Sequence, residues 1–240
     1  MQSVLEALGT LFIFYILPYI TVTIFFGGLL YNIISWLRTP APSTVLTLYP
    51  KPNEVMVGPA MTLDETIFPS LFSNKILWVF GVLLHLSLLA IAFGHVRLFG
   101  EPELIWSLMN LNEQGVETFA LIAGGGFGII FMVALLVLLA RRLSGIMKTV
   151  SIPMDYLLLI LLIAIAISGN FMRFAMHLDV AELQVYFSSL LVFNPTLTPT
   201  VLEPAFIIHY LITQALFIYL PFSKLVHVIG SLVTNYLVKR

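Results

Sequence analysis

The sequence contains no cysteine among its 240 residues. This absence excludes disulfide bonds, thiolate zinc sites and cysteine-held iron–sulfur clusters, so a redox cofactor would need other ligands. Charged residues are also scarce, at 10% of the chain, whereas a soluble domain has about 25%. With 60% hydrophobic residues and a mean hydropathy of +1.03, the chain has little surface suited to water. The net charge of −1 argues against a nucleic-acid partner.

Five apolar stretches are long enough to cross a bilayer, which takes about 17–25 helical residues. They run approximately over residues 8–34, 76–93, 119–140, 154–174 and 205–229. We therefore expect an all-α integral membrane protein, a bundle of five transmembrane helices surrounded by lipid. We expect residues 1–240 to form a single membrane domain.

The basic residues are distributed unevenly between the connections. If the N-terminus is outside, nine of the eleven Lys and Arg residues lie in inner segments, and only Arg97 and Arg173 lie at outer ends. Because Lys and Arg concentrate on the cytoplasmic side of membrane proteins, we expect an outer N-terminus and a cytoplasmic C-terminus. The inner connection, 37–74, contains six prolines, too many for a continuous helix. We interpret it as a docking surface for a cytoplasmic partner, with a simple linker as the alternative. The outer connection is 176–204.

Four histidines lie in the apolar segments, His85 and His95 in the second and His209 and His227 in the fifth. An ionisable side chain in hydrocarbon is costly unless a partner satisfies it. Each of these histidines is therefore a candidate functional residue. On the expected topology, His95 is level with His209 near the outer face, and His85 is level with His227 further in. The two pairs predict two haem irons with bis-histidine ligation, and hence an electron conductor across the membrane.

The distance along the sequence between the two histidines differs from the second span to the fifth. Ten residues of helix correspond to about 15 Å of rise and eighteen to about 27 Å, so the ligand levels do not match. If the fifth helix is continuous, eighteen residues make five complete turns and place both histidines on one face. Pro221 lies between them, and we expect it to kink this helix.

Other readings of these residues remain open. Each histidine could be a packing residue bonded to a neighbouring helix, whereas zinc would need four convergent ligands at one level. Gly94 and Gly125 could let a flat macrocycle approach the backbone, or could simply allow helices to pack closely. Arg97 and Arg173 could contact haem propionates, a quinone head group or lipid phosphate. We interpret His177, just beyond the fourth span, as an interface residue rather than part of a quinone site.

The histidine spacings, together with PFSK at 221–224, resemble the cytochrome b (gamma) subunit of respiratory nitrate reductase. Further stretches resemble more closely the membrane cytochrome b of the heterodisulfide-reductase-like, menaquinol-oxidising complex associated with dissimilatory sulfite reduction. They are PSLFSNK at 69–75, RLFGEP at 97–102, RRL at 141–143, IPMDY at 152–156 and ISGNFMR at 167–173. The order and spacing of these pieces cover the chain from Ser35 onward.

The resemblance implies a five-helix bundle with two haem b groups in a prokaryotic cell membrane, taking electrons from menaquinol. It places His95 and His209 on the outer haem and His85 and His227 on the inner one. The implied partners are a cytoplasmic iron–sulfur subunit like heterodisulfide reductase, a periplasmic multihaem cytochrome c, an iron–sulfur protein and a second quinone-interacting membrane subunit. Such a subunit completes no turnover alone.

One departure from nitrate reductase gamma subunits concerns quinone. Those proteins have a lysine before the third span, whereas residues 111–118 here contain no basic residue. Either Glu113, Glu117 or Arg97 takes over the quinol contact, or quinone binds differently. Glu101, Glu113 or Glu117 would release protons. Three alternatives stay open: reversed electron flow, a haem-free transporter or proton channel with histidine relays, and a haem-free membrane anchor.

Overall fold

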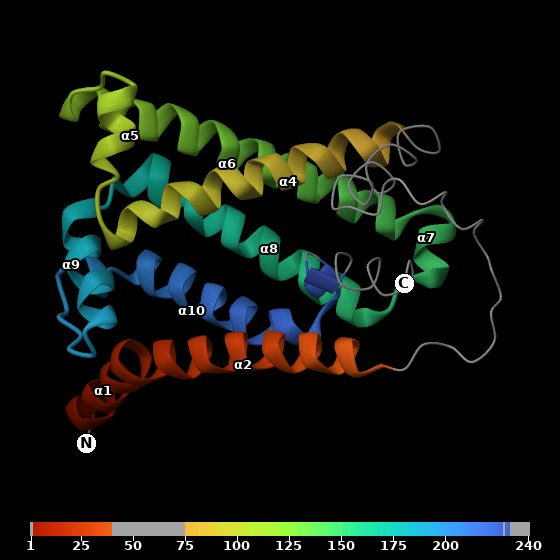
Figure 1. The fold of residues 1–240 in the computed structure, drawn as a ribbon, viewed down its shortest axis with the longest axis horizontal. Coiled ribbons are helices and arrows are strands. Elements are labelled where there is room, and N and C mark those ends of the chain that lie inside the picture. Colours follow the sequence, from red (N-terminus) through yellow and green to blue (C-terminus); the bar gives the residue numbers. More distant parts are fainter. Residues whose placement is uncertain (1, 40–74, 228, 231–240) are drawn as a thin grey trace. The chain divides into compact units, whose positions relative to one another are not determined.

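The computed structural model describes residues 2–39, 75–227 and 229–230, and the regular secondary structure in these ranges is helical (Figure 1). Five helices in the described ranges are long and apolar enough to cross a membrane. They run over Glu6–Arg38, Lys75–Phe99, Glu113–Leu143, Pro153–Met176 and Pro204–Phe222. This confirms the expected five spans, and the chain is a multi-pass membrane protein. Residues 40–74 of the expected docking loop lie outside the described residues.

The spans contain several irregular turns. The first consists of α1 (Gln2–Leu11), a π-helical turn (Phe12–Ile16) and α2 (Leu17–Arg38). The second is α4 (Lys75–Val96), followed by a 3-10 turn (Arg97–Phe99) and the short α5 (Glu103–Leu108). The third and fourth are α6 (Glu113–Leu143) and α8 (Pro153–Phe171), joined through α7 (Gly145–Val150), and α8 ends in a π-helical turn (Met172–Met176).

The outer connection contains a helix of its own, α9 (Val180–Leu191), and the fifth span begins as α10 (Pro204–Tyr219). Two 3-10 turns follow, Leu220–Phe222 and Lys224–Val226. The expectation of a kink at Pro221 is therefore confirmed. The rise of about 27 Å and the shared face of His209 and His227 assumed a continuous α-helix, and that assumption is wrong because α10 ends at Tyr219.

Contacts divide the chain into two compact units. Unit 1 comprises Met1–Tyr19 and Phe80–Leu216, and unit 2 comprises Ile20–Val79 and Phe217–Arg240. Three of the four histidines belong to unit 1, and His227 belongs to unit 2.

One core of unit 1 lies between α6 and α8. Its buried members are Phe131, Leu135, Leu162 and Ala166, with Leu84, Ile91 and Leu216 packed against them. An ion pair joins the end of α6 to the start of α8, because Arg142 Nη1 lies 2.6 Å from Asp155 Oδ2. The Tyr156 hydroxyl donates to the Arg142 carbonyl at 3.1 Å. These bonds hold the α6–α8 hairpin together.

The second core of unit 1 seats α9 against the first and fifth spans. Its buried members are Phe14, Leu183, Tyr186, Val201, Phe206 and Tyr210. The Tyr186 hydroxyl donates to the carbonyl of Phe14, in the π-helical turn, at 3.0 Å. A π-helical turn changes the backbone pairing at such a point, and here a buried side chain supplies the missing donor. The outer connection is thus an ordered part of unit 1.

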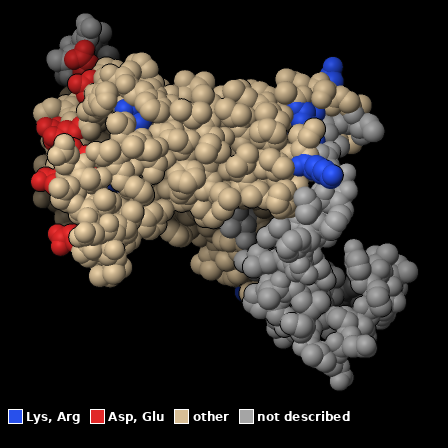
Figure 2. Space-filling view, turned by 90° about the horizontal axis from the view of Figure 1, so that it is seen from above, with Lys and Arg blue, Asp and Glu red and all other residues tan. Residues whose placement is uncertain are grey.

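The charges of unit 1 separate along α6. Glu101, Glu103, Glu113 and Glu117 lie around its first turn, and Arg141, Arg142 and Lys148 lie at or beyond its last. The described Asp and Glu residues all belong to unit 1, and those visible in Figure 2 gather at one end of that face. At 31 residues, α6 is about 46 Å long, more than the roughly 30 Å of bilayer hydrocarbon. Its two charged ends can therefore reach opposite interfaces.

Candidate haem and quinone site

His95 and His209 come together in unit 1 from two different spans. His95 is the penultimate residue of α4, and His209 lies in the second turn of α10. The two rings lie close enough to interact electrostatically. The structure therefore brings the expected pair into the same part of unit 1, although the two histidines are 114 positions apart in the sequence.

The hydrogen bond of His95 determines which ring nitrogen carries the proton. Nδ1 lies 2.7 Å from the carbonyl oxygen of Ile91, one turn back along α4. A carbonyl oxygen only accepts, so Nδ1 donates and Nε2 carries the lone pair. The ring is exposed, and this bond lies within its own helix. This differs from the alternative in which His95 packs against and bonds a neighbouring helix.

His209 is oriented by a residue of another span. Its Nδ1 lies 2.9 Å from the hydroxyl oxygen of Ser168 on α8. The Ser168 hydroxyl donates its single proton to its own helix, to Ala164 O at 2.8 Å or Ile165 O at 3.1 Å. Its oxygen is left to accept from Nδ1, so Nε2 of His209 also carries the lone pair.

His85 and His227 make the same kind of bond. His85 Nδ1 lies 2.7 Å from Gly81 O, and His227 Nδ1 lies 2.9 Å from Lys224 O. A protonated Nδ1 that is held by a backbone oxygen or hydroxyl is the usual outer-shell arrangement of a metal-binding imidazole, because it sets the tautomer and the ring angle. His85 belongs to unit 1 and His227 to unit 2, so their pairing stays a prediction.

The donor set suits haem rather than a metal ion held by protein alone. Among the described residues, no three His, Cys, Asp or Glu side chains form a metal-binding group. A haem iron needs only two protein ligands, because the porphyrin occupies its other four positions. Two neighbouring imidazoles with both Nε2 lone pairs available to a metal meet that requirement.

Two arginines lie at the same end of unit 1 as His95. Arg97 follows His95 by two residues, and Arg173 lies close enough to Arg97 for the two positive charges to repel. A Cβ atom at Gly124 would lie 3.2 Å from Arg173 Nη2, so Arg173 lies directly against α6. Within the described residues, the ion pair of Arg97 is with Glu101, and Arg173 has no carboxylate partner. Two guanidinium groups and one carboxylate leave this cluster with one net positive charge.

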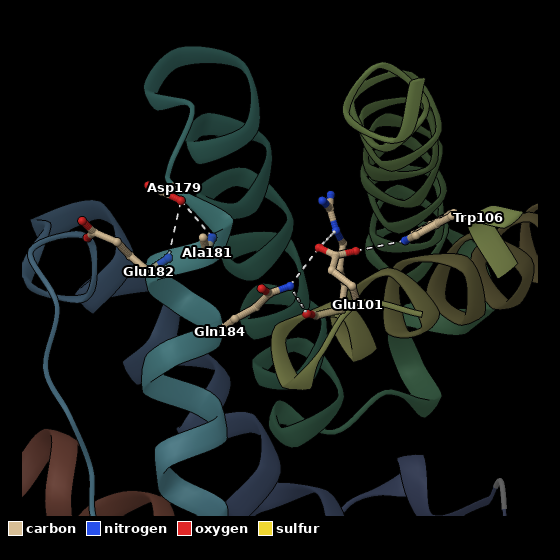
Figure 3. Close-up of polar contacts among 7 residues, drawn as sticks. Glu101, Trp106, Asp179, Ala181, Glu182 and Gln184 are labelled. Carbon is tan, nitrogen blue, oxygen red and sulfur yellow. Dashed lines mark hydrogen bonds and ion pairs between the residues drawn. The ribbon is translucent and has the colours of Figure 1, made fainter. Parts of the chain in front are cut away.

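Glu101 organises this end of the unit (Figure 3). Its carboxylate accepts hydrogen bonds from Arg97 Nε at 2.6 Å, Trp106 Nε1 at 3.0 Å and Gln184 Nε2 at 2.9 Å. Gln184 also donates to the Arg97 carbonyl at 2.9 Å. Partial burial opposes ionisation, but the bonds from Trp106, Arg97 and Gln184 outweigh it and hold the pKa of Glu101 below its ordinary value.

Comparison with known proteins identifies the family. A family model described as nitrate reductase gamma subunit matches residues 66–240. The chain belongs to this family. It is 30% identical to the Hdr-like menaquinol oxidoreductase cytochrome b-like subunit of Archaeoglobus fulgidus, over 90% of this chain and 75% of that protein. The same subunit of Archaeoglobus profundus is 30% identical over 92% and 76%. The nitrate reductase gamma chain of Bacillus subtilis is 28% identical over 93% and 92%.

The family resemblance expected from the sequence of this gamma-family chain is confirmed. The structure also shows the surroundings of two glycines and of His177. A Cβ at Gly125 would lie 2.7 Å from Cζ of Phe174, so Gly125 serves close packing of α6 against that ring. A Cβ at Gly94 meets none of the described residues within 4 Å. His177 adopts a left-handed backbone (φ 50°) and ends the π-helical turn after α8.

The sequence did not reveal the contacts that three residues make in the site. Ser168 bonds His209, Gly169 lies against the same ring with its Cβ position 3.2 Å from Cε1, and Gln184 reaches Glu101. The helix that carries Gln184 did have a signal. Asp179 followed three residues later by Glu182 is a capping pattern, and Asp179 accepts from Ala181 N at 2.8 Å (Figure 3). No local pattern indicates which histidine Ser168 contacts.

Proposed function

We propose that this gamma-family chain is a dihaem cytochrome b that exchanges electrons between the menaquinone pool and a cytoplasmic iron–sulfur subunit. The names of its relatives, a menaquinol oxidoreductase cytochrome b-like subunit and a nitrate reductase gamma chain, support quinol-linked electron transfer. The observation that carries the proposal is the juxtaposition of His95 and His209. Both rings have Nδ1 committed to a hydrogen bond and Nε2 available for iron.

The four histidines are the residues that would hold the cofactors. His95 and His209 would ligate the outer haem b, and His85 and His227 the inner one. Bound haem supplies reversible one-electron chemistry, with its potential set by axial ligands, hydrogen bonds and burial. The part of the protein is to hold each imidazole at a defined angle and to exclude water with apolar spans.

The charge distribution of unit 1 supports an outer N-terminus and a cytoplasmic C-terminus. Arg141, Arg142 and Lys148 mark the end of α6 that would face the cytoplasm, and the acidic residues around its first turn would face outward. On this orientation, the pair of His95 and His209 lies towards the outer face. Quinol would give up its electrons there and release its protons outside.

Arg97 and Arg173 would contact the haem propionates or the quinone head group. The Glu101 carboxylate holds Arg97 in place and already accepts three hydrogen bonds, which favours a positioning role over proton release. Glu113 and Glu117 are exposed at the start of α6, and they are better placed than Glu101 to release protons.

The partner would be a cytoplasmic iron–sulfur subunit like heterodisulfide reductase, within a complex associated with sulfite reduction. A periplasmic multihaem cytochrome c, an iron–sulfur protein and a second membrane subunit would complete that complex. The second candidate is a gamma subunit of a nitrate-reductase-type quinol oxidase, favoured by the match over 92% of the Bacillus subtilis chain. Subunits that co-purify with the tagged full-length chain separate the two, because the second candidate requires a nitrate-reducing catalytic subunit.

A reduced-minus-oxidised spectrum with a haem assay tests the proposal. We expect a b-type α band and about two haems per chain, one for each histidine pair. Absence of the α band would refute the central claim. About one haem per chain would mean that one pair is structural.

A further inference from the structure

We propose that one face of α2, formed by Gly28, Asn32 and Trp36, positions the inner haem ligand His227. These residues are four apart and so lie on one side of the helix. The first span contains no histidine, and its sequence does not indicate a part in cofactor binding. The inference rests on the proposed function and extends it to a second layer of residues within unit 2.

The contact begins where the fifth span breaks. In a continuous α-helix the Pro221 carbonyl would accept from the amide of Leu225. That amide instead donates to the Ser223 hydroxyl oxygen at 3.1 Å. The Pro221 carbonyl accepts from Asn32 Nδ2 at 2.7 Å. Asn32 thus satisfies a carbonyl that the helix break leaves open, and an unsatisfied carbonyl inside a membrane would be costly.

Gly28 brings α2 against the proline ring itself. A Cβ atom at Gly28 would lie 2.6 Å from Pro221 Cβ and 3.0 Å from its Cγ. No side chain fits at this position unless the 3-10 turn Leu220–Phe222 moves. Phe25, one turn earlier on α2, adds an edge-to-face contact with Phe217 at 5.1 Å between ring centroids. α2 therefore packs directly against the break.

A third contact holds the chain beyond His227. The Cβ position of Gly230 lies 3.1 Å from Cη2 of Trp36. His227 is therefore held between two points of contact with α2, Pro221 before it and Gly230 after it. The His227 ring has its Nδ1 hydrogen bond to Lys224 O, within the second 3-10 turn. Because the ring takes its angle from this turn, a shift of the turn against α2 rotates the imidazole.

Replacing the donor tests this positioning role. In Asn32→Leu the side-chain volume is nearly kept, but the donor to Pro221 is lost. We expect the inner haem to be retained more weakly, by up to about tenfold, the low end of the cost of losing a group that contacts a metal ligand directly. Its midpoint potential and low-spin electron paramagnetic resonance signal should change, while those of the outer haem stay as in the parent. Asn32→Gln keeps an amide donor and should restore part of the difference.

Asn170→Leu is the matched control, because Asn170 also donates from Nδ2 to a backbone carbonyl across a helix pair, Gly128 O at 3.1 Å. It should leave the inner haem unchanged. Gly28→Ala is an independent variant that keeps the Asn32 donor and displaces Pro221, and it should shift the inner haem signal as well. The proposal is overturned if the inner haem is unchanged in Asn32→Leu and Gly28→Ala. It is also overturned if either variant loses both haems equally, because the contact then serves folding rather than His227.

His227→Ala distinguishes this inference from the proposed function. If that variant keeps about two haems per chain, the assignment of the inner ligand is wrong. If it loses one haem while Asn32→Leu changes nothing, the haem assignment stands and only the positioning role fails.

Discussion

The hydroxyl oxygen of Ser168 lies 2.9 Å from Nδ1 of His209, across 41 residues of sequence. Ser168 belongs to α8 and His209 to α10, so this bond links two spans at the level of the outer pair. Because the hydroxyl proton is used within α8, the bond places the proton of His209 on Nδ1. A serine that looks like an ordinary small residue of a membrane helix thus orients the ring of His209.

Removal of this bond should affect the outer haem selectively. In Ser168→Ala, we expect the outer haem to be retained about 10–100-fold more weakly and its midpoint potential to change. Ser87→Ala is the matched control, because the buried Ser87 hydroxyl donates to the carbonyls of Leu83 and Leu84 in its own helix. Redox titration of the purified variants measures the midpoint potential, and the haem content measures haem retention. Equal shifts in the two variants would show that helix packing, not ring orientation, is responsible.

Removal of one outer ligand should leave one haem. In His95→Ala, we expect loss of the outer haem and retention of the inner one, so that haem per chain falls by about half. His177→Ala is the control, because His177 is exposed and lies in a left-handed turn outside the α-helices. The haem assay and the shape of the α band report the result. Loss of both haems together would contradict the level pairing.

The Glu101 cluster should make stability depend on pH at the acid end. The folded state lowers the pKa of Glu101, so its stabilisation is present above the unfolded value of about 4.3 and is lost as pH falls through the lower folded pKa. The side chain of Glu101 is 33% exposed, so we expect only about 0.5–1 kcal/mol. Glu101→Gln should lower the melting temperature near neutral pH and flatten its decline in acid.

Thermal unfolding of the detergent-solubilised protein between about pH 3 and pH 7 measures this dependence. Glu103→Gln is a suitable control, because Glu103 lies two residues away and in the described chain has no ion pair. An acid decline that is as steep in Glu101→Gln as in the parent would show that other groups control it.

The ion pair that joins α6 to α8 should be costly to break. The Asp155 side chain is 3% exposed, so Arg142→Met leaves a buried carboxylate without its cation. We expect a loss of about 3 kcal/mol, the low end for a buried pair, because the Arg142 side chain is 34% exposed. Arg141→Met should cost far less, because Arg141 forms no ion pair among the described residues. The double variant Arg142→Met/Asp155→Leu should recover much of the stability.

Local properties of the sequence predicted most of the spans. Second-span residues 76–93 were expected to be helical, and α4 covers Lys75–Val96, so His95 lies within it. The break at Pro221 followed from the missing amide proton of proline. The sequence analysis did not predict helix α9, although Asp179 and Glu182 form a capping pattern at its start. The orienting partners of the histidines could not be predicted, since they lie on other helices or depend on the local turn.

The sequence by itself determined that the chain is apolar enough for five membrane helices, that cysteine chemistry is absent, and that four imidazoles lie within apolar segments. Length and hydropathy are properties of short stretches of sequence, so they predict spans without any knowledge of how the helices pack. Tertiary structure alone decided that His95 lies near His209 and that Ser168 bonds the His209 ring. It also decided that Asn32 satisfies Pro221 across 189 residues. Such contacts depend on the register of one helix against another, which no local pattern encodes.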